Sequence, residues 1–139
     1  MENRELELIK NDLKIVTTNK LNSSQSKLLL IGIIFEILQR KDLFPRNSDL
    51  KNFVQQVFVE PIEGETPFRD YLFLSRTLLG SRVSKIILFK FEYSDVLNTV
   101  EKLSKILPNQ DIEHKHSSKS KTSDDGMNEW INFIRGKDN

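Results

Sequence analysis

The sequence contains no cysteine. A chain without cysteine forms no disulfide framework, no zinc–thiolate site and no catalytic thiol, so three classes of small protein are excluded. The sequence also has almost no net charge, because 21 basic residues face 20 acidic ones and the balance is +1. No overall basic field draws the protein to nucleic acid or to a membrane, so any such attraction must come from a local cluster of cations.

Long hydrophobic runs are missing as well. The longest, "LLLIGIIF" over residues 28–35, is far shorter than the roughly 20 apolar residues that a helix needs to cross a bilayer. The N-terminal stretch "MENRELELIK" is charged from its second residue and lacks the apolar centre of a signal peptide. We therefore expect a soluble, cytoplasmic protein that does not associate with a membrane.

What the sequence does contain is a globular composition with helical periodicity. Its 139 residues, 37% of them hydrophobic, suffice for one domain with a modest core. The first apolar residues are spaced by three, four and three positions, which is the stripe of an amphipathic helix. These residues are Leu6, Ile9, Leu13 and Val16. The sequence therefore predicts an all-α fold, a compact bundle of four to five helices.

The remaining helices are expected between turn signals. The helix over 25–41 is apolar nearly all round, which predicts a central core position, and Ser23 or Ser24 is its expected N-cap. Pro67 after Thr66 predicts a further helix start, with that helix continuing to about residue 90. An alternation of aromatic and charged residues leaves a short strand around 86–93 as the alternative. The other two helices are expected over 49–58 and 95–107.

The C-terminal part changes in character after residue 108. Residues 109–125, "NQDIEHKHSSKSKTSDD", contain a single aliphatic residue and are predicted to be a flexible polar linker between a helical domain over 1–108 and a tail over 126–136. The tail places four apolar residues at i, i+3, i+4 and i+7, including the only tryptophan: Met127, Trp130, Ile131 and Ile134. A helix this short is unstable alone in water, so it is ordered only if its stripe is buried, in cis on its own domain or in trans on another molecule, and is disordered otherwise. The sequence leaves both arrangements open.

The tail supports the first functional hypothesis. In trans, the four apolar residues would be the anchors of a docking helix, through which the chain binds a protein partner or a second copy of itself. The protein would then be a non-enzymatic interaction module, an adaptor or accessory subunit of a larger intracellular complex. On this hypothesis, Trp130→Ala would abolish partner binding and leave the thermal midpoint of the domain unchanged.

A local cluster of polar and basic residues supports the alternative hypothesis. Residues 25–58 form a helix, a turn around Pro45 and a helix with a polar start, which is loosely similar to a helix-turn-helix reader of nucleic acid. The residues expected on this face are Arg46, Asn47, Lys51, Arg69 and Arg76. The plainer interpretation is that these side chains are the solvated faces of amphipathic helices, and an acidic protein partner is a third possibility.

Motifs for catalysis and metal binding are absent. The sequence has no glycine-rich phosphate loop, no H-E-x-x-H and no G-x-S-x-G. Its two histidines, His114 and His116, lie in the expected linker, where nothing would orient them as ligands. The acidic residues Glu60, Glu63 and Glu65 fall in one proline-broken loop and are expected to keep it hydrated. We therefore expect no enzyme activity, no cofactor, no metal site and no small-molecule substrate.

Overall fold

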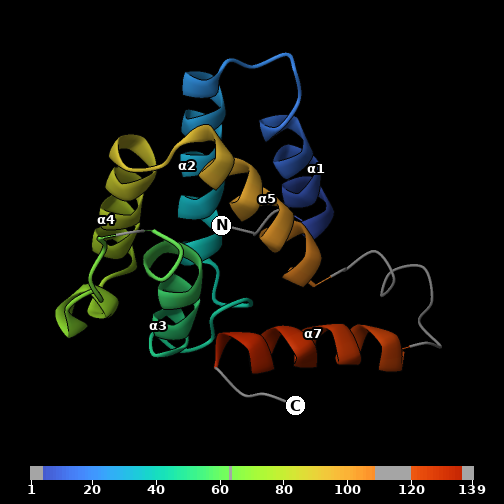
Figure 1. The fold of residues 1–139 in the computed structure, drawn as a ribbon. Helices are drawn as coiled ribbons and strands as arrows, with labels where there is room; N and C mark the ends of the chain where they lie inside the picture. Colours follow the sequence, from blue (N-terminus) through green and yellow to red (C-terminus); the bar gives the residue numbers. More distant parts are fainter. Residues whose placement is uncertain (1–4, 63, 109–119, 136–139) are drawn as a thin grey trace.

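The computed structural model describes residues 5–62, 64–108 and 120–135, and all regular structure in them is helical (Figure 1). The all-α class is therefore confirmed. The strand considered around 86–93 is wrong, because the fourth helix continues to Phe89. The α-helices are α1 (Leu6–Val16), α2 (Ser23–Gln39), α3 (Asp49–Val54), α4 (Arg76–Phe89), α5 (Tyr93–Ile106) and α7 (Ser120–Ile134).

Helix α2 occupies the centre, as its all-round apolar sequence predicts. It contacts α1, α4 and α5 (Figure 1), and its fully buried side chains form one broad face from Ser26 to Leu38. Its N-cap is Asn22 rather than Ser23 or Ser24. The Asn22 side chain accepts a hydrogen bond from the Gln25 backbone N–H at 2.8 Å, and the Gln25 side chain accepts one from the Asn22 N–H at 3.1 Å. This reciprocal capping satisfies two backbone donors that the helix itself leaves unpaired.

The close packing of α2 against α4 depends on one glycine. A Cβ atom placed on Gly80 would lie 2.7 Å from the ring of Phe35, which is closer than side chains approach. Gly32, in the middle of α2, has no neighbouring atom within 4 Å of the same position. Gly80 of α4 is therefore the residue that permits the close approach, and Gly32 is incidental to it.

Helix α4 begins later than the sequence predicts. The segment after Pro67 is extended, a 3₁₀ turn follows over Asp70–Leu74, and Ser75 caps α4 by accepting a hydrogen bond from the Leu78 N–H at 3.2 Å. The helix start predicted at Pro67 is therefore wrong, and the N-cap of α4 is Ser75 rather than Thr66. A helix that started at Pro67 is expected to turn Tyr71 and Leu78 inward, but both side chains are exposed.

Helix α3 is followed by a π-turn over Gln55–Val59. In this turn each N–H bonds to the carbonyl five residues earlier, and the Glu60 N–H donates to the Gln55 carbonyl at 2.9 Å. The corresponding donor for the Gln56 carbonyl would be residue 61, which is a proline and has no N–H. Lys102 of α5 supplies the missing donor, with its Nζ 3.3 Å from that carbonyl oxygen. The turn is thereby tied to α5.

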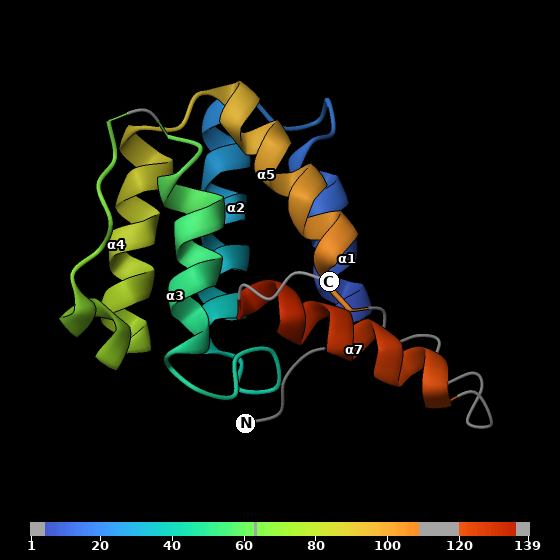
Figure 2. The same cartoon turned by 60° about the horizontal axis from the view of Figure 1, so that its bottom comes forward.

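The tail helix α7 crosses the molecule beside α3 and contacts α3 and α5 (Figure 2). It begins at Ser120 instead of residue 126, so the end of the expected linker is helical. The rest of that linker, 109–119, lies outside the described residues. The division into a domain, a linker and a docking helix stays a prediction.

Candidate functional site

The predicted tail stripe packs against the chain's own core. Trp130 is 0% exposed, and its ring centroid lies 5.5 Å from that of Phe44 and 5.8 Å from that of Phe53. Its indole Nε1–H donates a hydrogen bond of 2.7 Å to the Leu43 carbonyl, so its one polar group is satisfied. Ile134 is also completely buried. In this structure the tail docks in cis.

An ion pair holds the C-terminal end of α7 onto α3. Arg135 donates to Asp49 through Nε at 2.8 Å and through Nη2 at 3.3 Å, and the Arg46 backbone N–H donates to the same carboxylate at 2.9 Å. The Asp49 side chain is 1% exposed. Burial raises the pKa of Asp49, but the Arg135 hydrogen bond, the Arg46 N–H and the two positive charges outweigh it and bring the pKa below its usual value of 3.8. The buried carboxylate is therefore fully ionised at neutral pH.

This arrangement predicts a pH-dependent stability. Since the pKa of Asp49 is lowered on folding, its contribution is fully present above the pKa of the unfolded chain and is lost as the pH falls through the folded value. We expect Asp49→Asn to lower the free energy of unfolding at pH 7, and the difference from wild type to shrink between about pH 5 and pH 2. Urea unfolding at several pH values measures it. Arg135→Gln should give the same trend, and a difference independent of pH would contradict the assignment.

The cis docking bears on the partner-binding prediction for the tail. Trp130 and Ile134 offer no surface to another molecule, and Met127 and Ile131 are half-buried against the core. A partner can reach the four residues only after α7 leaves its place. Their role as partner anchors stays a prediction that requires undocking.

The residues of the predicted basic face differ in how they are used. Arg76 was expected to point outward, but it is half-buried, and burial lowers the pKa of its guanidinium while the charge of Asp49 opposes that shift. It donates to the backbone carbonyls of three residues that end α2 or follow it. These are Leu38 and Arg40, each at 3.3 Å, and Phe44. Arg76 therefore ties the 40–48 connection to the start of α4 through hydrogen bonds within the chain.

The other four residues of that face are mostly paired within the chain. Asn47 accepts a hydrogen bond from Arg76 Nε at 3.0 Å, and Lys51 forms an exposed ion pair with Asp70 at 3.0 Å. Arg46 reaches Asp49 with one guanidinium nitrogen at 3.5 Å. Among the described residues, Arg69 has no ion-pair partner. The connection between α2 and α3 also spans residues 40–48, longer than the three- or four-residue turn of a helix-turn-helix motif. The nucleic-acid role of the five residues stays a prediction.

The acidic and histidine clusters form no metal site that the structure describes. Glu65 pairs with Lys90, and Glu60 is exposed. Glu63, His114 and His116 lie outside the described residues. Within those described, no group of three or more histidine or acidic side chains is arranged to hold a metal ion.

Sequence analysis missed an apolar and cationic surface on the outer side of α4. Leu78, Leu88 and Phe89 are 43%, 42% and 75% exposed, and Arg82 and Lys85 lie between them along the same helix. Neither cation has an ion-pair partner among the described residues; Arg82 lies over the ring of Phe68, 5.7 Å from its centroid. We call these five residues the outer face of α4. The sequence does not predict this surface, because a helix that started at Pro67 would turn Leu78 inward.

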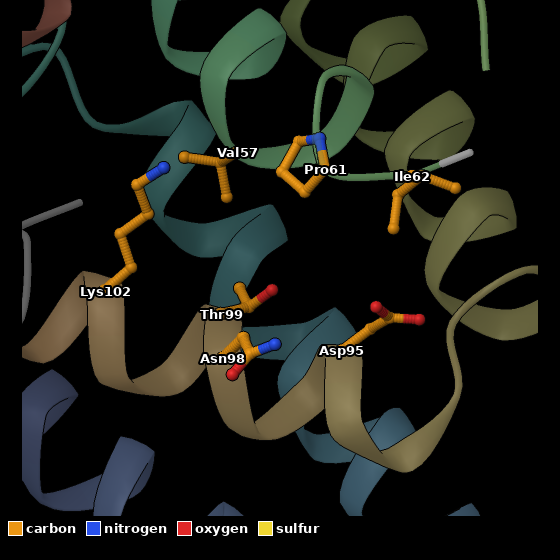
Figure 3. A pocket seen from close by; sticks show the side chains of 7 residues that line it. All are labelled: Val57, Pro61, Ile62, Asp95, Asn98, Thr99 and Lys102. Atoms are coloured by element: carbon orange, nitrogen blue, oxygen red, sulfur yellow. The ribbon is translucent and has the colours of Figure 1, made fainter. Parts of the chain in front are cut away.

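A second feature is a half-open cavity of about 210 Å³ between the π-turn and α5 (Figure 3). One wall is apolar and follows the π-turn, while the facing wall is a polar stripe on α5. The apolar wall consists of Val57, Pro61 and Ile62, and the polar wall of Asp95, Asn98, Thr99 and Lys102. The i, i+3, i+4, i+7 spacing of the polar wall is visible in the sequence, but nothing in the sequence says what faces it.

Comparison with known proteins finds no relative of this chain. No protein-family model matches the chain, and neither a curated protein nor a solved structure matches it. Within the described residues, no helix has both the length and the apolar composition of a membrane span. The candidate sites therefore rest on the geometry of this chain alone.

Proposed function

We propose that the protein is a non-enzymatic interaction module, an accessory subunit of an intracellular complex, and that its partner binds the outer face of α4. The observation that carries the proposal is the exposure of Phe89, Leu78 and Leu88 beside two cations that have no acidic partner among the described residues. Large exposed apolar groups in one patch are typical of protein-binding surfaces. The tail helix then serves as part of the module's core.

The charge of this face specifies the kind of partner. Helix α4 contains three cations, Arg76, Arg82 and Lys85, and no acidic residue. A partner segment that buries the apolar side chains and also neutralises Arg82 and Lys85 is an amphipathic helix with acidic flanks. A second copy of the chain fits less well, because a two-fold contact between outer faces would bring like charges together.

Nucleic acid fits this face less well than an acidic protein does. Phosphates would pair with Arg69, Arg82 and Lys85, but they would leave the rings and methyl groups of Phe89 and Leu78 exposed to water. Arg76, which a phosphate-binding role would need, is engaged with backbone carbonyls. Binding to nucleic acid is therefore an alternative outcome of the test.

The test is co-purification of the full chain from native lysate, with and without nuclease, followed by carbodiimide cross-linking. This reagent joins a lysine amine to a carboxylate in direct contact. We expect a protein that is retained after nuclease and is cross-linked from Lys85 to an acidic segment. Phe89→Ser and Lys85→Glu should each abolish its capture, whereas both should change the free energy of unfolding by less than about 0.5 kcal/mol because the positions are exposed.

The matched control is Ile15→Ser, on the exposed side of α1, where the side chain is 45% exposed. This variant removes an exposed apolar group from another surface, so it should retain the partner. Equal capture by the wild type and the α4 variants would contradict the proposal. Material that disappears with nuclease would assign the basic side chains to nucleic acid instead.

A further inference from the structure

One buried polar group in the cavity lacks a partner. Four polar or charged residues of the described chain are buried: Ser26, Arg40, Asp49 and Thr99. The first three are hydrogen-bonded through their side chains. Thr99 is only 6% exposed, and its hydroxyl has no hydrogen-bond partner among the described residues. Buried polar groups are almost always hydrogen-bonded to protein or to water, so this hydroxyl is free to bond to a water molecule or a ligand that enters the cavity.

The Thr99 hydroxyl faces the cavity rather than the core. Figure 3 shows its oxygen directed from α5 toward the gap below Pro61, with Asn98 beside it. A ligand in the cavity would therefore reach this hydroxyl, which both donates and accepts. The hydroxyl marks the middle of the polar wall.

The two ends of the polar wall carry opposite charges. Lys102 lies at one end and uses one of its three N–H groups on the Gln56 carbonyl, so two remain to donate. Asp95 lies at the other end, and one carboxylate oxygen accepts from the Glu92 N–H at 2.8 Å while the other oxygen has no partner among the described residues. Two helical turns separate the two residues, about 10 Å along the axis. The wall is therefore complementary to a molecule that has a negative group at one end and a positive group at the other.

We propose that this cavity binds a small zwitterion, a molecule of amino-acid size with one carboxylate and one ammonium group. The carboxylate pairs with Lys102, the ammonium group pairs with Asp95, and Thr99 bonds to the ligand between them. The connecting carbons lie against Val57, Pro61 and Ile62. A cavity of about 210 Å³ has room for such a molecule, since one of about 150 Å³ holds benzene. The site is separate from the outer face of α4, so the test of ligand binding is independent of the test of the proposed function.

The experiment is a titration of the full chain followed by the backbone amide signals of α5. Three zwitterions that differ in the separation of their charges serve as probes: glycine, 4-aminobutyrate and 6-aminohexanoate. We expect at least one to shift the signals of residues 95–102 with a dissociation constant of about 1 mM, as suits so few atoms. Butyrate and butylamine, which each carry one of the two charges, should bind at least tenfold more weakly.

Variants separate specific binding from a nonspecific effect. Thr99→Val keeps the shape of the side chain and should weaken binding about three- to tenfold, the effect of one hydrogen bond, while the thermal midpoint does not fall. Lys102→Met should weaken it about ten- to a hundredfold, because a charge-assisted contact is lost. The matched control is Lys105→Met on the same helix, where Lys105 pairs with Glu101 on the surface; binding should be unchanged.

Three results would overturn the inference. The first is that none of the three zwitterions shifts the α5 signals at about 50 mM, well above the expected constant. The second is that butyrate or butylamine binds as tightly as the zwitterions, which would assign the cavity to a single charge. The third is unchanged affinity in Thr99→Val, which would separate the unpaired hydroxyl from binding.

Discussion

Replacing Trp130 with alanine is expected to lower the thermal midpoint by about 10 °C. Removing a fully buried aromatic side chain typically costs about 3–5 kcal/mol, because the lost contacts are compounded by a cavity that the surroundings fill only partly. Trp130 meets this condition, since it is 0% exposed and packs against Phe44 and Phe53. The substitution also leaves the buried Leu43 carbonyl without its donor.

The measurement is thermal and urea unfolding of Trp130→Ala beside Trp130→Phe and Phe89→Ala. Trp130→Phe keeps an aromatic ring but loses the hydrogen bond, so its loss should be smaller, about 1–2 kcal/mol. Phe89→Ala removes an aromatic group that is 75% exposed and should change stability by less than about 0.5 kcal/mol. An unchanged midpoint in Trp130→Ala would mean that the tail is not part of the core in solution, and the docking-helix hypothesis would then be favoured.

Replacing Arg76 with methionine is expected to lower the free energy of unfolding by about 2–4 kcal/mol. One guanidinium group holds the carbonyls of Leu38, Arg40 and Phe44 together with the Asn47 side chain. The first two of these carbonyls belong to the C-terminal end of α2, where no intrahelical donor is available. The Arg40 carbonyl also accepts from the Phe44 N–H at 3.0 Å, so it keeps one donor in the variant. Methionine preserves much of the apolar volume but donates to none of the four oxygens.

The matched control for Arg76 is Arg69→Met, measured by urea unfolding under the same conditions. Arg69 is exposed and has no ion-pair partner among the described residues, so we expect a change below about 0.5 kcal/mol. Arg76→Lys should recover little, because an ammonium group cannot address several acceptors in a planar fork. Were Arg76→Met as stable as wild type but weaker in a salt-dependent DNA-binding assay, Arg76 would be a phosphate ligand and the basic-face hypothesis would regain support.

Because Trp130 belongs to the core, truncation of the tail is an unsuitable test of partner binding. Truncation after Thr122 removes Trp130 together with the Arg135–Asp49 ion pair. Loss of a partner in a truncated chain would then reflect unfolding as easily as loss of an anchor. Substitutions on the exposed outer face of α4 avoid this ambiguity, because they leave the core intact.

The sequence by itself determined the helical class and most of the helices. The stripe from Leu6 to Val16 and the stripe of α7 follow from the 3.6-residue period, and α2 follows from a continuous apolar stretch between turn signals; both are local properties of the chain. Local signals were misleading at the start of α4: the sequence predicts a helix from Pro67, whereas the segment after Pro67 is extended and Ser75 caps the helix. The end of the linker predicted over 109–125 was also wrong, since α7 begins at Ser120.

Only the tertiary structure decided which distant residues meet. The docking of Trp130 on Leu43, the pairing of Arg135 with Asp49 and the use of Arg76 between helices join positions far apart in the chain. No periodicity encodes such contacts, because they depend on how whole helices cross. The same holds for Thr99, whose hydroxyl is unremarkable in the sequence and becomes a candidate ligand contact only because the π-turn encloses a cavity over it.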